Sequence, residues 1–117
     1  MNVVIISGNL GADPDVKVTN SGKAMVKFRV AVDRSYYAEG GAKISATDWF
    51  QVVVWDSQAE SCAKYLQKGS KVVIRGSLRP REWKDEQNVD HRIVEINAES
   101  VEFAGKTKSQ DQVETSA

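Results

Sequence analysis

The segment from Thr47 to Trp55 constrains the fold more than any other part of this 117-residue chain. Side chains on a β-strand point alternately to opposite faces of the sheet. One face of such a strand carries the core-like residues Phe50, Val52 and Val54. The opposite face carries Trp49, Gln51, Val53 and Trp55. Because both faces hold large apolar side chains, the sheet must either cover both or use one of them for binding.

Tryptophan rings on an open sheet face are stacking platforms, since every nucleobase has a π-face to lay on them. Core burial is the first alternative, because tryptophan is highly buried on average. A structural oligomer that hides both rings in a protein–protein interface is the second. Binding is favoured over core burial because Phe50, Val52 and Val54 already supply a core face.

The charge of the chain is balanced overall but is distributed unevenly. Sixteen Lys and Arg residues match sixteen Asp and Glu residues, so the whole molecule is not a polyelectrolyte binder. Between Lys64 and Lys84, however, Glu82 is the only acid against seven cations: Lys64, Lys68, Lys71, Arg75, Arg79, Arg81 and Lys84. A solvated face is the ordinary explanation of a basic run. Here Trp83 lies inside the run, and an aromatic ring among cations favours nucleic-acid binding.

The sequence offers little material for catalysis or for a metal site. Cys62 and His91 are the only residues of their types, which excludes an intrachain disulfide, a Cys-rich zinc site and a His cluster. The acidic pairs Asp13/Asp15 and Asp85/Glu86 lie in polar turns, and no glycine-rich phosphate loop opens a helix. We therefore expect no enzymatic activity, no metal and no cofactor.

The N-terminal residues predict the location of the protein. The apolar run from Val3 to Ile6 is too short for a signal peptide or a membrane span, and Met1 leads almost directly into a predicted strand. A transit peptide is therefore not expected. The predicted location is the bacterial cytoplasm, in association with the nucleoid.

Alternation and turn residues predict the elements in order. Strands are expected over 2–10, 24–33, 49–55, 71–79, 92–98 and 101–103, with a short one over 16–19. In the 24–33 strand the core face is Val26, Phe28, Val30 and Val32. Its exposed, basic face is Met25, Lys27, Arg29 and Ala31. Val72, Ile74, Gly76 and Leu78 are expected to point inward, and Lys71, Val73, Arg75, Ser77 and Arg79 outward.

Two segments without strand alternation are predicted as a projecting hairpin loop over 35–46 and a charged loop over 80–89. A helix is predicted over 58–67 because Ala59, Cys62, Ala63 and Leu66 recur at helical spacing. Ser57 and Glu60 match a capping box at its start, and Gly69 suits the position just after its end.

Three strands, one helix and two strands are the element order of an all-β, five-stranded Greek-key barrel, the OB-fold. The helix then lies between the third and fourth barrel strands. That fold binds oligonucleotides across its second and third strands, where Lys27, Arg29, Trp49 and Trp55 are expected. We assign residues 1–104 to this domain. Residues 105–117 are predicted to be a disordered polar tail, because Val113 is their only large aliphatic side chain.

Four motifs resemble the bacterial single-stranded DNA-binding proteins over about residues 2–103. They are Asn-Val-Val-Ile-Ile-Ser-Gly-Asn-Leu-Gly-Ala-Asp-Pro-Asp-Val at 2–16, Thr-Asp-Trp at 47–49, Ala-Lys-Tyr-Leu-Gln-Lys-Gly-Ser at 63–70 and Gly-Ser-Leu-Arg-Pro-Arg-Glu-Trp at 76–83. The resemblance implies base stacking on Tyr36, Trp49, Trp55 and Trp83. It implies phosphate contacts from Lys68, Arg79 and Arg81, to which the exposed strand faces add Lys27, Arg29 and Lys71. Glu82 occupies a position where a basic residue is common in that family.

The resemblance also implies a homotetramer that wraps single-stranded DNA without reading its sequence and protects it during replication, recombination and repair. The alternative is a primosomal or RNA-binding OB-fold protein, with a dimer as its assembly. Members of the bacterial single-stranded DNA-binding protein family usually end in a short acidic tip that recruits replication and repair proteins. This sequence ends in Gln-Val-Glu-Thr-Ser-Ala, so recruitment of such partners is left open.

Overall fold

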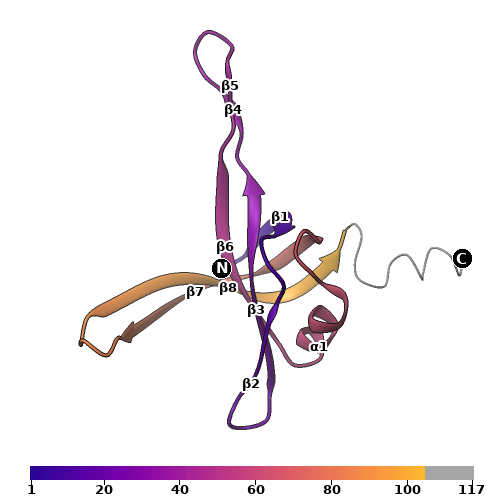
Figure 1. Cartoon of the computed structure of the whole chain (residues 1–117), viewed down its shortest axis with the longest axis vertical. Helices are drawn as coiled ribbons and strands as arrows, with labels where there is room; N and C mark the ends of the chain where they lie inside the picture. The colour runs from indigo at the N-terminus through magenta and orange to yellow at the C-terminus, as the bar shows by residue number, and fades with distance from the viewer. Residues whose placement is uncertain (105–117) are drawn as a thin grey trace, which may run out of the picture.

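Five strands close on themselves around an aliphatic core in the computed structural model, which describes residues 1–104 (Figure 1). They are β1 (Val4–Leu10), β3 (Ala24–Asp33), β6 (Thr47–Trp55), β7 (Lys71–Lys84) and β8 (Asp90–Phe103). The order in the sheet is β1-β7-β8-β6-β3, and β3 pairs back to β1 at Asn9–Ala31 and Leu10–Val30. Only β6 and β8 run parallel. The predicted all-β OB-fold is confirmed, with α1 (Asp56–Tyr65) between its third and fourth barrel strands.

The core is built from the inward faces of these strands and from one side of α1. Val26, Val30, Val52, Val54, Val72 and Ile74 are fully buried, and Phe28 and Ile96 are nearly so. Ala59, Cys62 and Leu66 close the barrel from the helix side. At Gly8, β1 approaches β3 so closely that a Cβ atom would lie 2.1 Å from the carbonyl oxygen of Ala31. Glycine at this position therefore allows the barrel to close.

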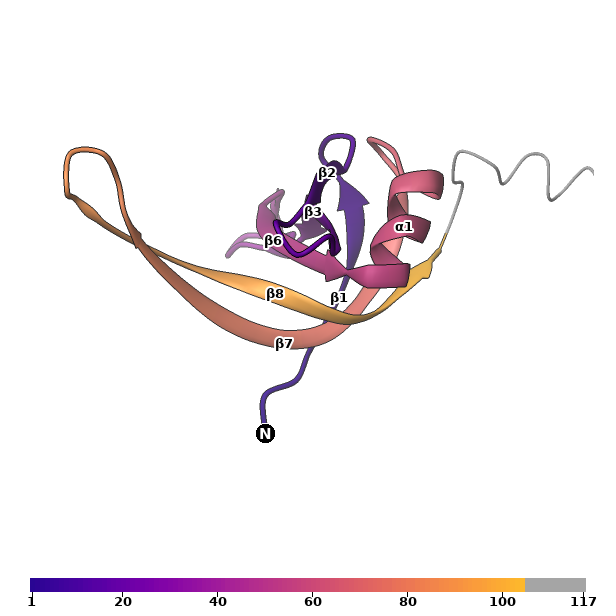
Figure 2. The same ribbon diagram turned by 90° about the horizontal axis from the view of Figure 1, so that it is seen from below.

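Two arms leave the barrel in different directions (Figure 1). The first is a hairpin of β4 (Tyr36–Tyr37) and β5 (Lys43–Ile44), which joins β3 to β6 inside the predicted 35–46 loop. The second is the ribbon arm, residues 80–94, in which β7 and β8 pair with each other beyond the last β1–β7 pair at Val4 and Gly76 (Figure 2). Strand β2 (Asp15–Val18) is added at the edge of β3.

The structure corrects the sequence prediction at the ribbon arm. The predicted 80–89 loop is wrong for its first half, because β7 continues through Trp83 to Lys84. The two predicted strands over 92–98 and 101–103 are one strand, interrupted by a register shift at Glu99. Leu78 was expected in the core but is 41% exposed. It lies two residues beyond the last β1–β7 pair at Gly76, where the Asn2 side chain bonds to its backbone N–H and C=O in place of a paired β1 residue.

The helix also differs from its prediction at both ends. It begins at Asp56, two residues early, with Trp55 as its N-cap and no side-chain capping bond, so the predicted capping box is not formed. It ends at Tyr65 with Leu66 as C-cap, and Gly69 lies in the following turn with φ +90°. Within residues 1–104, no helix is long and apolar enough to cross a membrane. The predicted tail, 105–117, lies outside the described residues.

Candidate nucleic-acid interface

The strand register brings all three tryptophans to one face of the sheet. On β6 the outward residues are opposite those of β3, with Met25 paired to Trp55, Lys27 to Val53 and Ala31 to Trp49. On the other side of β6, Val53 pairs with Asn97 of β8, and Asn97 in turn pairs with Ser77 of β7. We call this surface the outer face. It comprises Met25, Lys27, Arg29, Ala31, Trp49, Gln51, Val53, Trp55, Ser77, Arg79, Arg81, Trp83, His91, Ile93, Glu95 and Asn97.

Trp49 lies where the outer face meets the connection between β1 and β2. Its side chain is 49% exposed, and the guanidinium carbon of Arg29 is 4.9 Å from the ring centroid. A Cβ atom on Gly11 would come within 2.4 Å of the indole, so only glycine lets the ring lie against this connection. A hollow beside the ring is lined by Gly11, Ala12, Asp15, Lys27, Phe28, Arg29, Trp49 and Gln51. The ring thus has an accessible edge next to open space and a cation.

Trp55 is held in a fixed orientation by a neighbouring strand. Its indole N–H donates a hydrogen bond of 3.1 Å to the side-chain oxygen of Asn97 on β8. The side chain stays 37% exposed. A ring whose polar edge is already bonded within the protein presents its apolar surface to the outside, which suits stacking.

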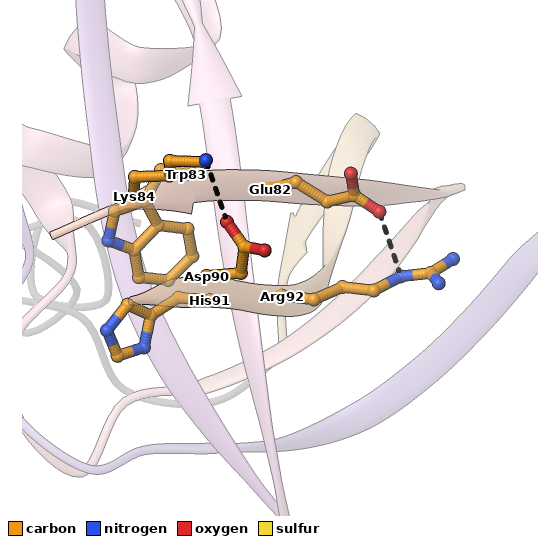
Figure 3. A pocket seen from close by; sticks show the side chains of 6 residues that line it. All are labelled: Glu82, Trp83, Lys84, Asp90, His91 and Arg92. Carbon is orange, nitrogen blue, oxygen red and sulfur yellow. Dashed lines mark ion pairs between the residues drawn. The ribbon is translucent and has the colours of Figure 1, made fainter. Parts of the chain in front are cut away.

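Trp83 is carried by the ribbon arm, well away from the barrel core. The ring is 38% exposed, and the guanidinium carbon of Arg81 lies 4.5 Å from its centroid. The imidazole of His91 is stacked on it with centroids 5.2 Å apart and planes 17° apart (Figure 3). Trp83 therefore occupies a strand position on the outer face, not the loop position that was predicted.

Glu95 is an acidic residue of the outer face that the sequence analysis did not single out. Its side chain is buried. It accepts hydrogen bonds from Gln51 Nε2 at 2.6 Å and Arg81 Nε at 3.1 Å, and Lys27 Nζ is 3.9 Å away. Two of the predicted phosphate-binding cations are thus paired with an acid. The available signal was the alternation of 92–98, which places Glu95 on the same face as the basic residues.

The other predicted residues are divided between the outer face and its surroundings. Arg29 and Arg79 lie on the outer face and are exposed. Lys68 is in the turn after α1, where its backbone N–H donates to Asp13, and Lys71 lies opposite Asn9 of β1. The structure does not bring these two lysines onto the outer face. Tyr36 is 50% exposed on the hairpin arm.

The hairpin arm is anchored at its base by polar contacts. Arg34 and Asp48 form an ion pair of 3.0 Å across the two strands that lead into it. The hydroxyl and backbone N–H of Ser35 both donate to Asp33, and they hold the pKa of Asp33 below its ordinary value. Tyr36 lies opposite Ile44 and Tyr37 opposite Lys43, so the two tyrosines are on opposite faces of the arm.

The remaining chemistry of the described residues gives no reactive centre. Burial raises the pKa of the Cys62 thiol to about 12, so the nucleophilic thiolate is scarce at neutral pH. Among residues 1–104, no three His, Cys, Asp or Glu side chains gather in a way that would hold a metal ion. What the geometry offers is a binding surface of half-exposed rings with cations beside them.

An OB-fold barrel with aromatic rings and cations on one sheet face defines the class of single-stranded nucleic-acid-binding proteins. Comparison with known proteins narrows this class. Residues 1–104 match the single-strand binding protein family, and the chain belongs to that family of non-enzymatic DNA-binding proteins. The family predicted from the sequence is thereby confirmed.

Two relatives show the extent of the similarity. The chain is 33% identical over 110 residues to Single-stranded DNA-binding protein 1 of Chlorobaculum tepidum, covering 93% of this chain and 68% of that protein. It is also similar to the solved structure of the Plasmodium falciparum SSB complex with ssDNA, with a TM-score of 0.82 at 29% identity. That similarity covers 90% of this chain and 96% of the other.

Removing the Glu95 carboxylate should destabilise the fold and loosen the outer face. Glu95→Ala leaves the donors of Gln51 and Arg81 without their acceptor and Lys27 without its ion-pair partner. Hydrogen bonds to a charged group are worth roughly 1.5–3 kcal/mol. We expect the free energy of unfolding, measured with urea, to fall by about 2 kcal/mol. Glu82→Ala is the matched control, because its pair with Arg92 is exposed and should change stability by less than about 1 kcal/mol. Equal effects of the two variants would contradict a special role for Glu95.

Proposed function

We propose that the protein binds single-stranded DNA without sequence preference and shields it during replication, recombination and repair. The observation that carries the proposal is the common face of Trp49, Trp55 and Trp83, each between about one third and one half exposed. Bases would stack on these rings and on Tyr36, while cations beside them attract the phosphates. Binding of ssDNA by the related Plasmodium falciparum complex supports this choice of ligand.

The polar side chains of the outer face support binding that ignores base identity. Amide side chains read base edges when both their donor and acceptor are free to form a paired contact. Here Gln51 donates its amide to Glu95, and Asn97 gives its oxygen to the indole of Trp55. Each amide is thus already held within the protein by one of its two polar groups. The rings that remain accessible accept any base.

The cations are proposed to act in two ways. Arg29 and Arg79 are the outer-face cations that no carboxylate holds among the described residues, and they would contact phosphates directly. Lys68 and Lys71 are proposed as further phosphate contacts outside that face. Lys27 and Arg81 are both paired with Glu95. They would therefore attract DNA phosphates less and would mainly hold the side chains of the outer face in place. A bacterial cytoplasmic location with nucleoid association stays a prediction of the sequence.

Single-stranded DNA is expected to quench the tryptophan emission of the protein as bases stack on the rings. Oligothymidine should quench strongly, while a duplex should do far less, because its bases are already stacked on each other. The apparent affinity should fall with salt, by a slope of about 0.7 per phosphate neutralised. Titrations followed by fluorescence at two salt concentrations measure both effects. Equal quenching by single strands and duplex would contradict stacking, and preference for oligouridine would favour the RNA-binding alternative.

Loss of a single ring should weaken binding without unfolding the protein. Trp49→Ala and Trp83→Ala each remove one stacking surface, worth roughly 1–3 kcal/mol per base. Because Trp83 lies on the ribbon arm, its loss should barely change the melting temperature. Trp49→Phe is the control, since it keeps a ring and should retain most of the affinity. A large fall in melting temperature with unchanged affinity would mean that the rings serve the fold.

A homotetramer is proposed as the working assembly. Ile5 and Val3 at the start of the chain are 63% and 58% exposed. Half-buried Val73 is paired with Ser7 on the β1–β7 part of the barrel wall, which the outer face does not include. Apolar side chains at such positions gain from being covered by another copy. Sedimentation equilibrium at micromolar concentration should give four times the chain mass. A monomer would contradict the proposal, and a dimer would favour the primosomal alternative.

A further inference from the structure

The buried carboxylate of Glu95 lies on the face that we propose for DNA, and base stacking makes no use of it. Its side chain is 8% exposed. One carboxylate oxygen accepts the Nε–H of Arg81 at 3.1 Å. The other accepts the side-chain amide of Gln51 at 2.6 Å and lies 3.9 Å from Nζ of Lys27. A single acid is therefore paired with two cations of the outer face, one from β7 and one from β3.

Glu95 divides the Lys and Arg residues of the outer face into two pairs. Lys27 and Arg81 are held by its carboxylate. Arg29 and Arg79 are exposed, and within residues 1–104 no carboxylate holds either of them. A phosphate that approaches Lys27 or Arg81 competes with Glu95, whereas a phosphate that approaches Arg29 or Arg79 does not. The electrostatic attraction of the outer face for DNA is therefore smaller than its number of cations suggests.

Single strands and duplexes differ in what they gain from such a surface. Duplex DNA carries about one negative charge per 1.7 Å of helix axis, and each phosphate neutralised adds about 0.9 to its salt slope, against about 0.7 for a single strand. Additional free cations therefore help duplex DNA at least as much as single strands. Only a single strand has bases that are free to stack on the rings. A carboxylate that neutralises two cations thus lowers the attraction for both forms of DNA and leaves stacking as the part that distinguishes them.

The same carboxylate holds side chains that neighbour two of the rings. Gln51 and Lys27 line the hollow beside Trp49. The guanidinium carbon of Arg81 is 4.5 Å from the ring centroid of Trp83. If the carboxylate is lost, these three side chains lose the group that orders them, and the cost of ordering them falls on DNA binding. Stacking of single strands would then weaken while the attraction for phosphates would grow.

We propose that Glu95 is a specificity-determining residue, which favours single-stranded over duplex DNA by neutralising Lys27 and Arg81 and by ordering the side chains beside the stacking rings. This inference rests on the proposed function of the outer face. Glu95 acts through its neighbours and does not itself contact DNA, so it is a positioning residue. Its removal should change the ratio of the two affinities, which a residue that serves only the fold would not change.

The test measures the affinities of the wild type and of Glu95→Gln for oligothymidine and for a duplex over a range of salt concentrations. Glutamine keeps the size of the side chain and removes its charge. The duplex affinity should rise roughly fivefold, as expected for one charge about 4 Å from a phosphate in water. Its salt slope should steepen by up to about 0.9 for each cation released. The single-strand affinity should rise less, because lost ordering around the rings offsets the gain, so the ratio of single-strand to duplex affinity should fall.

Glu82→Gln is the matched control. Glu82 is paired with Arg92 on the opposite face of the ribbon arm, so its loss removes one acid without freeing a cation of the outer face (Figure 3). The ratio of the two affinities should then stay as in the wild type. Thermal melting followed by circular dichroism shows whether each variant is folded.

A second comparison leaves Glu95 in place and decides the case in which Glu95→Gln does not fold. Arg79→Gln should make the single-strand salt slope shallower by about 0.7, because Arg79 is free to contact a phosphate. Lys27→Gln should reduce the slope by less than half as much, because Lys27 is already neutralised. Equal reductions in the two variants would show that Glu95 does not neutralise Lys27 and would overturn the proposal.

The outcomes also separate this inference from the function on which it rests. If the wild type binds oligothymidine no more tightly than duplex, the proposed function is wrong. If the wild type prefers oligothymidine and Glu95→Gln keeps the same ratio of affinities, Glu95 does not set the choice between the two forms of DNA. The same conclusion holds if Glu82→Gln lowers the ratio as far as Glu95→Gln does.

Discussion

The antiparallel register between β3 and β6 is the constraint on which the rest of the structure depends. It pairs Met25 with Trp55 at one end and Asp33 with Thr47 at the other. In this register Val26, Val30, Val52 and Val54 enter the core together, and Trp49 and Trp55 point outward beside Lys27 and Arg29. A slip of one residue would exchange the faces and bury tryptophans where valines pack. The close passage of β1 over β3 at Gly8 positions the other edge of β3, where the barrel closes.

Glu95 gives the outer face a feature that a simple basic surface lacks. A carboxylate in the middle of a proposed phosphate-binding surface opposes DNA electrostatically. Its burial and its bonds to Gln51 and Arg81 nevertheless place the guanidinium of Arg81 close to Trp83. The outer face therefore attracts DNA less strongly than a purely basic surface would. In return, its rings and cations are already ordered before DNA binds. Ordering that is already complete in the free protein reduces the cost of binding.

Much of the barrel was visible in the sequence because its signals are local. The 24–33 strand was predicted with its bounds, since its alternation is regular and a glycine-containing turn precedes it. The ribbon arm was not predicted, because Pro80 and the charged residues after it resemble a loop. Their strand conformation comes from pairing with residues 90–94 of β8 across the turn, and the charged side chains of this segment give no sign of that pairing. The predicted start of α1 was also wrong, by two residues. Strand β6 runs directly into the helix, and the Ser57 hydroxyl is not used as a cap.

The residues of the candidate site were likewise predictable only where the signal is local in the sequence. Trp49 and Trp55 were placed on one face by strand alternation alone, and the register of β7 with β8 adds Trp83 to that face. The cluster of Gln51, Arg81 and Lys27 around Glu95 joins side chains from four strands. No local sequence pattern predicts that these four side chains come into contact. The stacking of His91 on Trp83 likewise required knowledge of the cross-strand pair.

Ultraviolet cross-linking of bound oligothymidine, followed by mass spectrometry of the attached peptides, tests most directly whether the outer face binds the strand. The structure predicts that thymines become attached to the aromatic residues of the outer face, Trp49, Trp55 and Trp83, and to Tyr36 on the hairpin arm. Attachment confined to β1, β2 or α1, with these four rings unmodified, would contradict the proposed interface.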